Sequence, residues 1–453
     1  MSTPHPLFLL HHGNDLEMLA GVLAAELARP LPGRALLEPD TVLIPQPAMR
    51  RWLQKTLAQT HGIAANLRFL APGEFVRDAL DANVPGAGDE AVGDADVLRW
   101  RLWSVLGDAR AMAEPVFAPL APLLQRQDDG VAAWALAGEL AQAFEKYQAW
   151  RRDWLRRWDK GADADDWQAQ LWRRATRGLS HRGRRLDAYL SRFNGTDKHV
   201  PVGLPPRVFA FACQNVSPDV LRVIASSARA GTLHFFFLSP VAGWWGDLVT
   251  ARERLHADAD AVFDDSENPL LRANGASGRD FVRTLFSYEV VHPDQDFPLY
   301  VAPDPLQRRG LLHDLQRDLL ARRPPPVDGA LQRPFEEGAL ADRSLQVHAC
   351  HTRLREVQVL HDQLRDLLER DPGLQPRDIA VLTPDIDAYA PFVQAVFAGD
   401  AGNSPAIPFS LSDGSRLANE SVAEALLRLL ALPGSRFAVN DVLDLLSVAA
   451  IAE

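Results

Sequence analysis

The sequence predicts an α/β protein in which a parallel sheet is interrupted by a largely α-helical insertion. Two strand–helix units fill the first 60 residues, a long stretch without strand patterns follows, and buried-strand runs resume near residue 207. Strands that alternate with helices are typical of parallel sheets. We therefore expect residues 1–75 and 201–322 to form one domain around a helical insertion at 76–200.

The first strand–helix unit is predicted from the apolar run Leu7–Leu10 and from a helix that begins near Asp15. Asn14, with Glu17 three residues later, has the spacing of a capping box. The second unit pairs the strand Thr41–Ile44 with a helix that follows Pro45 and Pro47. Apolar residues at helical spacing define the two helices: Leu16, Leu19, Leu23 and Leu27 in the first, and Met49, Trp52, Leu53 and Leu57 in the second.

The remaining elements follow from the same patterns. Helices are expected near residues 97–106, 131–150, 167–177, 218–228 and 306–320, and strands at Arg207–Ala212 and Leu233–Pro240. A linker is expected at 323–343, and a second α/β domain at 344–453. In that domain we expect strands at Ser344–Cys350 and Asp378–Pro384 and helices at Glu356–Leu368 and Tyr389–Phe397. The final leucine-rich helix has no completed sheet after it, which predicts a piece of a longer protein.

Composition is that of a globular protein, with 453 residues, 47% hydrophobic and 24% charged. No apolar run reaches the roughly 20 residues that cross a bilayer, and no secretory signal pattern opens the chain. The two cysteines, Cys213 and Cys350, suit a reducing compartment. We expect a cytoplasmic protein without membrane contact.

Charge is segregated along the chain. The net charge is −11, yet residues 146–192 hold thirteen basic and six acidic residues, a local charge of +7. We call this segment the basic band. Five tryptophans are interleaved with its arginines, and most of them are expected in a helical core. The arginines as a group indicate a surface for a polyanion.

The loop after the first strand lies where a nucleotide-binding loop would lie, but it lacks the groups for phosphate. His12, Gly13 and Asn14 offer one glycine, no lysine and no Ser or Thr hydroxyl. The strand that ends at Ala212 is followed by Cys213 and Gln214, and no acid precedes Asp219 to hold a metal. Both absences argue against ATP binding and predict a degenerate nucleotide loop.

Other catalytic patterns are weak. His348, Cys350 and His351 lack a second ligand pair for zinc, and Asp385 lacks companion acids for a nuclease centre. No G-x-S-x-G nucleophile motif occurs. We expect no catalytic residue and no metal site.

Five segments carry a family likeness: GIAANLRF (62–69), WRRDWLRRW (150–158), LPPRVFAFACQNVSP (204–218), residues 350–397, and LLRLLALPGSRFAVNDVLDLLSV (426–448). They resemble the RecC family, the gamma subunits of bacterial exodeoxyribonuclease V. The resemblance covers nearly the whole chain and implies an inactive superfamily-1 helicase-like fold with RecA-like domains. In those terms, residues 1–75 and 201–322 would be domain 1A, 76–200 a 1B-like insertion, and 344–453 the start of domain 2A.

The resemblance implies a DNA-binding subunit that acts with RecB-like and RecD-like partners on double-strand ends in recombinational repair. Such a subunit channels single-stranded DNA and reads a crossover-hotspot sequence. ATP and magnesium would be used by the partners, so no cofactor is expected in this chain.

Positions matching the family's hotspot-reading residues are Gln46, Arg151 and Arg182, with Glu145 replacing an aspartate. Ala71, Arg77, Gln142 and Ala143 depart from the family pattern, which predicts altered or relaxed recognition. From the basic residues nearby we add Arg51, Arg152 and Arg156 as DNA-binding candidates. Two alternatives remain: an active DNA-stimulated ATPase, and a pure assembly scaffold whose basic band meets an acidic partner.

Overall fold

A computed structural model describes residues 7–31, 33, 35, 37–84, 95–124, 130–193, 199–257, 267–287, 292–303, 310–324, 342–398, 406–412, 421–448 and 451. The chain divides into two compact units, Met1–Ser344 and Leu345–Glu453. The first unit holds a sheet and a helical lobe. The described residues of the second unit hold helices.

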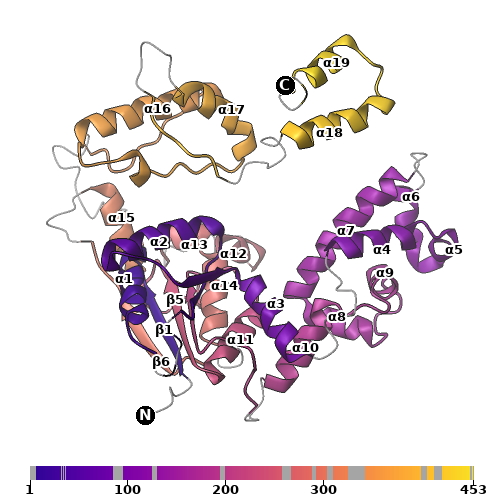
Figure 1. The fold of residues 1–453 in the computed structure, drawn as a ribbon, viewed down its shortest axis with the longest axis horizontal. Helices are drawn as coiled ribbons and strands as arrows, with labels where there is room; N and C mark the ends of the chain where they lie inside the picture. The colour runs from indigo at the N-terminus through magenta and orange to yellow at the C-terminus, as the bar shows by residue number, and fades with distance from the viewer. Residues whose placement is uncertain are drawn as a thin grey trace. The chain divides into compact units, whose positions relative to one another are not determined.

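The first unit is built on a six-stranded parallel sheet with the spatial order β3-β2-β4-β5-β1-β6. Strands β1, β5 and β6 are labelled in Figure 1. Its strands are β1 (Leu7–Gly13), β2 (Asp40–Leu43), β3 (Leu67–Leu70), β4 (Arg207–Phe211), β5 (Thr232–Leu238) and β6 (Gln295–Leu299). The predicted α/β class is confirmed. The sequence pattern misses the two edge strands, β3 and β6. Of these, β6 contains Pro298, which an edge strand tolerates because one side of its backbone needs no ladder.

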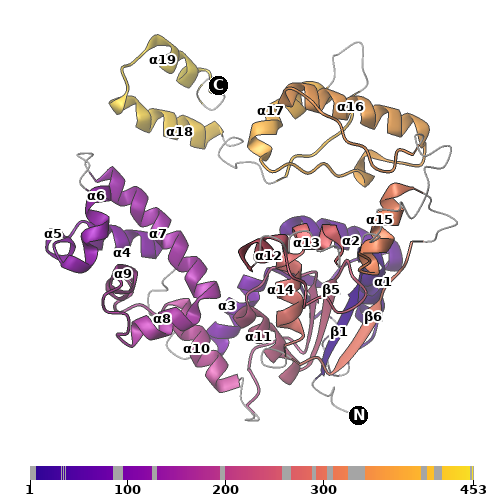
Figure 2. The same ribbon diagram turned by 180° about the vertical axis from the view of Figure 1, so that it is seen from behind.

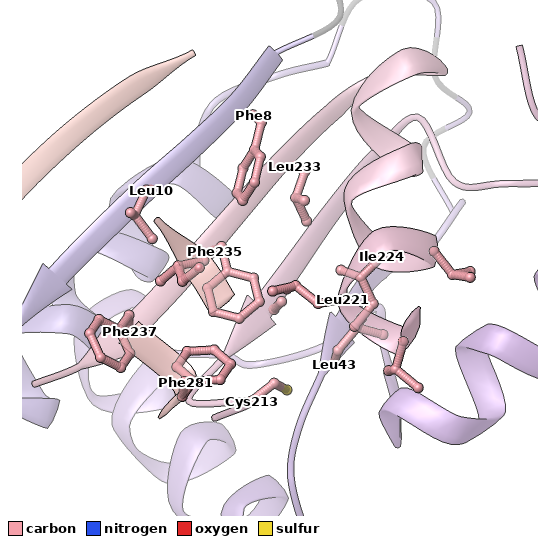
Figure 3. Packing of buried hydrophobic residues seen from close by; sticks show 14 of the residues in the cluster. Phe8, Leu10, Leu43, Cys213, Leu221, Ile224, Leu233, Phe235, Phe237 and Phe281 are labelled. Atoms are coloured by element: carbon pink, nitrogen blue, oxygen red, sulfur yellow. The ribbon is translucent and has the colours of Figure 1, made fainter. Parts of the chain in front are cut away.

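Helices cover both faces of the sheet. On one face, Leu19 and Leu23 of α1 (Leu16–Leu27) and Leu53 of α2 (Pro47–His61) pack on the inner strands. The other face packs against α3 (Pro72–Asn83), α10 (Arg182–Phe193), α11 (Pro218–Ser226) and α14 (Ala276–Leu285). Figure 3 shows Phe235, Phe237 and Phe281 within this second core. Because β5 is covered on both sides, its run of apolar residues is continuous rather than alternating.

The helical lobe (Figure 2) lies between β3 and β4 in the chain. It has its own hydrophobic core. Its elements are α4 (Ala95–Leu106), α5 (Ala109–Met112), η1 (Pro115–Leu120), α6 (Ala121–Leu124), α7 (Val131–Trp150), α8 (Arg152–Asp159) and α9 (Trp167–Ala175). Trp158 and Trp172 are 3% and 0% exposed in this core, as expected, whereas Trp150 is 52% exposed. Helices α3 and α10 flank the lobe in sequence and pack on the sheet.

The first unit also contains η2 (Ser227–Arg229) between α11 and β5, and the short helices α12 (Ala251–Ala257), α13 (Pro269–Asn274) and α15 (Leu311–Leu320) after β5. After α15, Arg322 pairs with the buried Glu267 and with Asp247. Most of the expected linker, and the first residues of the helix expected at 306–320, lie outside the described residues.

In the second unit, α16 (Arg353–Arg370) and α17 (Ile386–Phe397) form a small core, and η5 (Pro376–Asp378), α18 (Ser421–Ala431), η7 (Leu432–Gly434) and α19 (Val439–Leu446) complete the described elements. Both predicted helices are confirmed. The strands predicted at Ser344–Cys350 and Asp378–Pro384 are wrong, since neither segment is a strand. Val347 and Leu382 are 93% and 94% exposed there, and a strand requires a paired neighbour that the described residues of this unit do not supply.

Across the described ranges, every helix is too short or too polar to cross a lipid bilayer.

Candidate nucleic-acid interface

A cleft of about 510 Å³ opens at the carboxyl edge of the sheet, where it meets the helical lobe. Loops that follow three strands form one wall: Pro45 and Gln46 after β2, Ala71–Gly73 after β3, and Cys213–Ser217 after β4. The opposite wall is the end of α7 and the start of α10. The complete lining is Pro45, Gln46, Ala71, Pro72, Gly73, Ala149, Trp150, Arg182, Cys213, Asn215, Val216, Ser217 and Val220. Ligands of parallel α/β sheets bind at this edge because the loops there converge.

Gln46 reaches the cleft because β2 ends just before it and α2 begins just after it. It is the N-cap residue of α2 in an extended conformation (φ −157°, ψ 156°), yet its side chain makes no capping hydrogen bond. Pro47 occupies the first helical position, where its missing N–H costs nothing. The exposed amide of Gln46 therefore keeps its donor and acceptor atoms free of the helix end.

Arg182 reaches the cleft as the first residue of α10. Its guanidinium lies 3.7 Å from the carboxylate of Glu145 on α7, and the two side chains are 29% and 39% exposed. This pair joins lobe helix α7 to sheet helix α10 at the cleft wall. Because a partly exposed pair at this separation contributes little to stability, typically about 0–1 kcal/mol, the guanidinium can exchange Glu145 for another acceptor.

A buried hydrogen-bond hub fixes the start of α10. The backbone N–H of Arg184 donates to Nδ1 of His181 at 3.3 Å, so Nε2 carries the proton donated to Asp159 at 3.0 Å. Trp172 and Arg184 also donate to Asp159. Burial alone would raise the pKa of Asp159, but the hydrogen bonds from His181 and Arg184 outweigh it and lower the pKa to about 2. Residue 182 is thus held in place by its neighbours.

Arg151 and Arg152 are adjacent in sequence but differ in role. Arg151 joins α7 to α8, is exposed, and has its guanidinium 5.3 Å from the ring centre of Trp154. The Arg152 side chain is 15% exposed and pairs with Asp187 of α10 and, at 2.7 Å, with Asp219 of α11. Arg152 therefore joins the lobe to the sheet helices, and its predicted contact with DNA stays a prediction.

Other arginines of the basic band are also paired. Arg156 lies 3.2 Å from Asp187, although its side chain is 54% exposed. Further ion pairs in the band are Arg157–Asp163, Arg174–Glu114, Arg184–Asp159 and Arg185–Asp81. Two of these partners, Asp81 and Glu114, lie outside the band, so a charge count over the band alone overstates the free positive charge.

The remaining predicted positions divide between the cleft and the surface. Ala71 lines the cleft. Arg51 on α2 and Arg77 on α3 are exposed, as is Gln142 on α7, but none of the three is among the lining residues. Trp150 and Asn215 line the cleft without having been singled out as binding residues. Trp150 ends a long helix next to Arg151, and this position is the one sequence signal that could have identified it.

The loop after β1, predicted to be a degenerate nucleotide loop, is shorter than the sequence suggests. His12 and Gly13 belong to β1, whose backbone pairs with β5 and β6, so their N–H groups are not directed at an anion. A side chain at Gly13 would lie 2.1 Å from the carbonyl oxygen of Leu299. Gly13 therefore permits the close approach of β6, which is a structural reason for a glycine at this position.

The side chains after Gly13 bond to neighbouring backbone groups, and we call the result a closed loop. Asn14 exchanges two hydrogen bonds of 2.8 Å with the backbone of Val301, beyond β6. The N-cap of α1 is Asp15, which accepts from the N–H of Met18 at 2.9 Å, so the capping box predicted for Asn14 is wrong. A carboxylate at the amino end of α1 repels the phosphates that a nucleotide loop attracts.

The loop after β4 carries the thiol of Cys213. Cys213 is 1% exposed, and burial raises the pKa of its thiol to about 12. A protonated, buried thiol is a poor metal ligand and a poor nucleophile. Asp385, predicted as a loop acid, caps α17 by accepting from the N–H of Ala388.

Comparisons with known proteins give one family. The model of the RecC N-terminal domain matches residues 8–322. The RecBCD enzyme subunit RecC of Escherichia coli K12 is 32% identical, and the alignment covers 98% of this chain and 42% of that protein. The subunits of the same name from Haemophilus influenzae and Mycolicibacterium smegmatis are each 29% identical, over 99% and 96% of this chain and 44% and 40% of those proteins. The chain spans about two fifths of the length of these curated relatives.

Proposed function

This chain belongs to the RecC family, and from that premise we propose that it is a non-catalytic, DNA-handling subunit of a RecBCD-type helicase–nuclease complex in double-strand break repair. RecB-like and RecD-like subunits would be its partners in the cytoplasm, and the ATP and magnesium of the complex would be theirs. In this proposal, single-stranded DNA that passes through the complex binds in the cleft.

One observation carries the proposal. Gln46 and Arg182 match hotspot-reading positions of the family, are far apart in sequence, and line the same cleft. An amide and a guanidinium are the side chains that most often read base edges. Ala71 lines the cleft where the family pattern has a larger residue, and this supports a relaxed or altered recognition sequence.

The finer fold proposal is a helicase-like, RecA-type frame that has lost its ATPase groups. Its support is the parallel sheet, the closed loop after β1 and the buried thiol after β4. In this proposal residues 76–200 correspond to the 1B-like insertion and residues 344–453 to the start of a second helicase-like domain.

The test is binding of an oligothymidylate by the chain and its variants Arg151→Glu and Arg182→Glu at about 50 and 200 mM salt. Both variants should weaken binding, and loss of one phosphate contact should flatten the salt slope by about 0.7. Arg110→Glu, an exposed arginine of α5 away from the cleft lining, is the matched control. Equal affinities for all four proteins would refute the DNA role of the cleft.

A pure assembly scaffold is the second candidate, and the ion pairing within the basic band favours it. A scaffold would assemble with its partner subunits in the presence of DNA without any crosslink from the strand to this chain.

A further inference from the structure

The cleft contains an aromatic surface that the proposed function does not use. Trp150 ends α7, lines the cleft and is 52% exposed. No ring of the described residues packs against its indole, whereas Trp158 and Trp172 of the same lobe each pack against other rings. The large apolar face of this indole would gain free energy if a flat apolar group covered it.

The groups around Trp150 are those that contact a nucleotide. Gln46 and Asn215 carry exposed amides, each with donors and acceptors, and Arg182 adds a cation. Arg151, the next residue in the chain, is exposed and has no ion-pair partner among the described residues. The volume of about 510 Å³ lies within the range of about 300–1,000 Å³ for small-molecule sites.

We propose that Trp150 is a stacking platform for one unpaired nucleobase, whose edge faces the amides of Gln46 and Asn215 and whose phosphate faces Arg151. The inference rests on the proposed function, and it specifies that the cleft takes a splayed nucleotide of a single strand. A base within a duplex has both faces covered by its neighbours, so only an unpaired base can present a face to the indole.

If Trp150 stacks on a base, part of the DNA affinity depends on the bases and the rest on the phosphate backbone. Base–aromatic stacking contributes about 5- to 150-fold in affinity for each base. A strand of the same length that carries abasic sites in place of bases keeps its phosphates and loses every stacking partner. Trp150→Ala should therefore weaken binding of the base-bearing strand within that range and leave binding of the abasic strand unchanged.

The experiment measures binding of an oligothymidylate and of a fully abasic strand to the full chain and its variants. Trp150→Phe should retain most of the affinity that Trp150→Ala loses, because phenylalanine keeps an aromatic face. Trp100→Ala is the matched control, since Trp100 is 59% exposed and does not line the cleft. On the wild-type chain, a strand containing 5-iododeoxyuridine should photo-crosslink to Trp150, identified by mass spectrometry.

The outcomes distinguish the two proposals. If Arg182→Glu weakens binding of both strands but Trp150→Ala weakens both equally or neither, the DNA cleft stands and the stacking platform is refuted. If the wild-type chain binds base-bearing and abasic strands equally well, stacking is refuted as well. If it binds neither strand, the DNA role itself fails. In the assembled complex, Trp150 could be covered by a partner subunit and give no crosslink to DNA. That result would refute the stacking platform and identify a protein side chain as the group that covers the indole.

Discussion

Replacing Arg152 by methionine should destabilise the first unit more than any other single arginine change in α8. Arg152 contacts carboxylates on two different helices, Asp187 of α10 and Asp219 of α11, and its side chain is 15% exposed. Methionine keeps much of the side-chain volume and removes the charge. The substitution leaves two carboxylates, 27% and 12% exposed, without their strongest partner.

The size of the stability loss depends on the cations that remain near Asp187 and Asp219. Breaking a fully buried ion pair costs about 3–5 kcal/mol, because the partner is left charged and unpaired. Here Arg156 still lies 3.2 Å from Asp187 and Arg222 lies 3.3 Å from Asp219, so each carboxylate keeps one cation. We expect a loss of about 2 kcal/mol, below the fully buried range. Arg157→Met is the matched control, because its pair with Asp163 is 61% and 29% exposed and should contribute about 0.2–1 kcal/mol.

The loss should depend on pH. Burial raises the pKa of Asp187 above 3.8, and Arg152 opposes that rise. Without Arg152 the folded-state pKa rises further, so the folded state binds a proton more tightly than the unfolded state. The part of the deficit that comes from Asp187 is then absent well below pH 3.8, grows as the pH rises through the folded-state pKa of Asp187, and is complete above it.

The assay is urea unfolding of the chain and both variants, followed by circular dichroism, at neutral and at acidic pH. Arg152→Met should lower the free energy of unfolding more than Arg157→Met at neutral pH, and the difference should shrink in acid. Equal losses for the two variants, or a difference that does not change with pH, would refute the assignment of Arg152 as the link between lobe and sheet.

Three further predictions follow from the loop and the thiol. Gly13→Ala should lower the free energy of unfolding, measured in urea, by about 1–3 kcal/mol, because the new Cβ would meet the Leu299 carbonyl. The control Gly21→Ala has open space around the new Cβ in α1 and should be neutral or stabilising. ATP with magnesium should not shift the melting temperature of the chain, and a concentration-dependent rise would contradict the closed loop. Cys213, whose thiol has a pKa of about 12, should resist iodoacetamide at pH 8 in the native chain and react after unfolding. Mass spectrometry identifies the labelled cysteine, and labelling of Cys213 in the native chain would contradict its burial.

Local sequence patterns predict the elements whose causes are local. The leucines of α1 recur at helical spacing, and Leu19 and Leu23 are buried as that spacing requires. The runs that become β4 and β5 are apolar because both faces are covered. Local patterns do not predict edge strand β6, because its five residues QDFPL neither alternate nor form an apolar run, include Pro298, and become a strand only by pairing with β1.

Side-chain roles depend on partners that are distant in sequence. Asn14 and Asp15 are both good N-cap residues, and the choice between them is made by Val301, which takes the Asn14 side chain. Arg151 and Arg152 look equivalent in the sequence of the basic band, but only Arg152 forms an ion pair with Asp219 in the folded chain. The cleft combines loops after three strands with the end of α7 and the start of α10, so the family resemblance could single out Gln46 and Arg182 but not where they meet.

The most direct test of the DNA cleft is the path of a single strand through the assembled complex. A photoreactive strand, stalled in the complex of this subunit with its partners, would be crosslinked and the modified peptides mapped. The account predicts crosslinks in the segments after β2, β3 and β4 and at the junction of α7 with α8, and their loss in the Arg182→Glu variant. Crosslinks confined to other surfaces, with these segments unmodified, would contradict it.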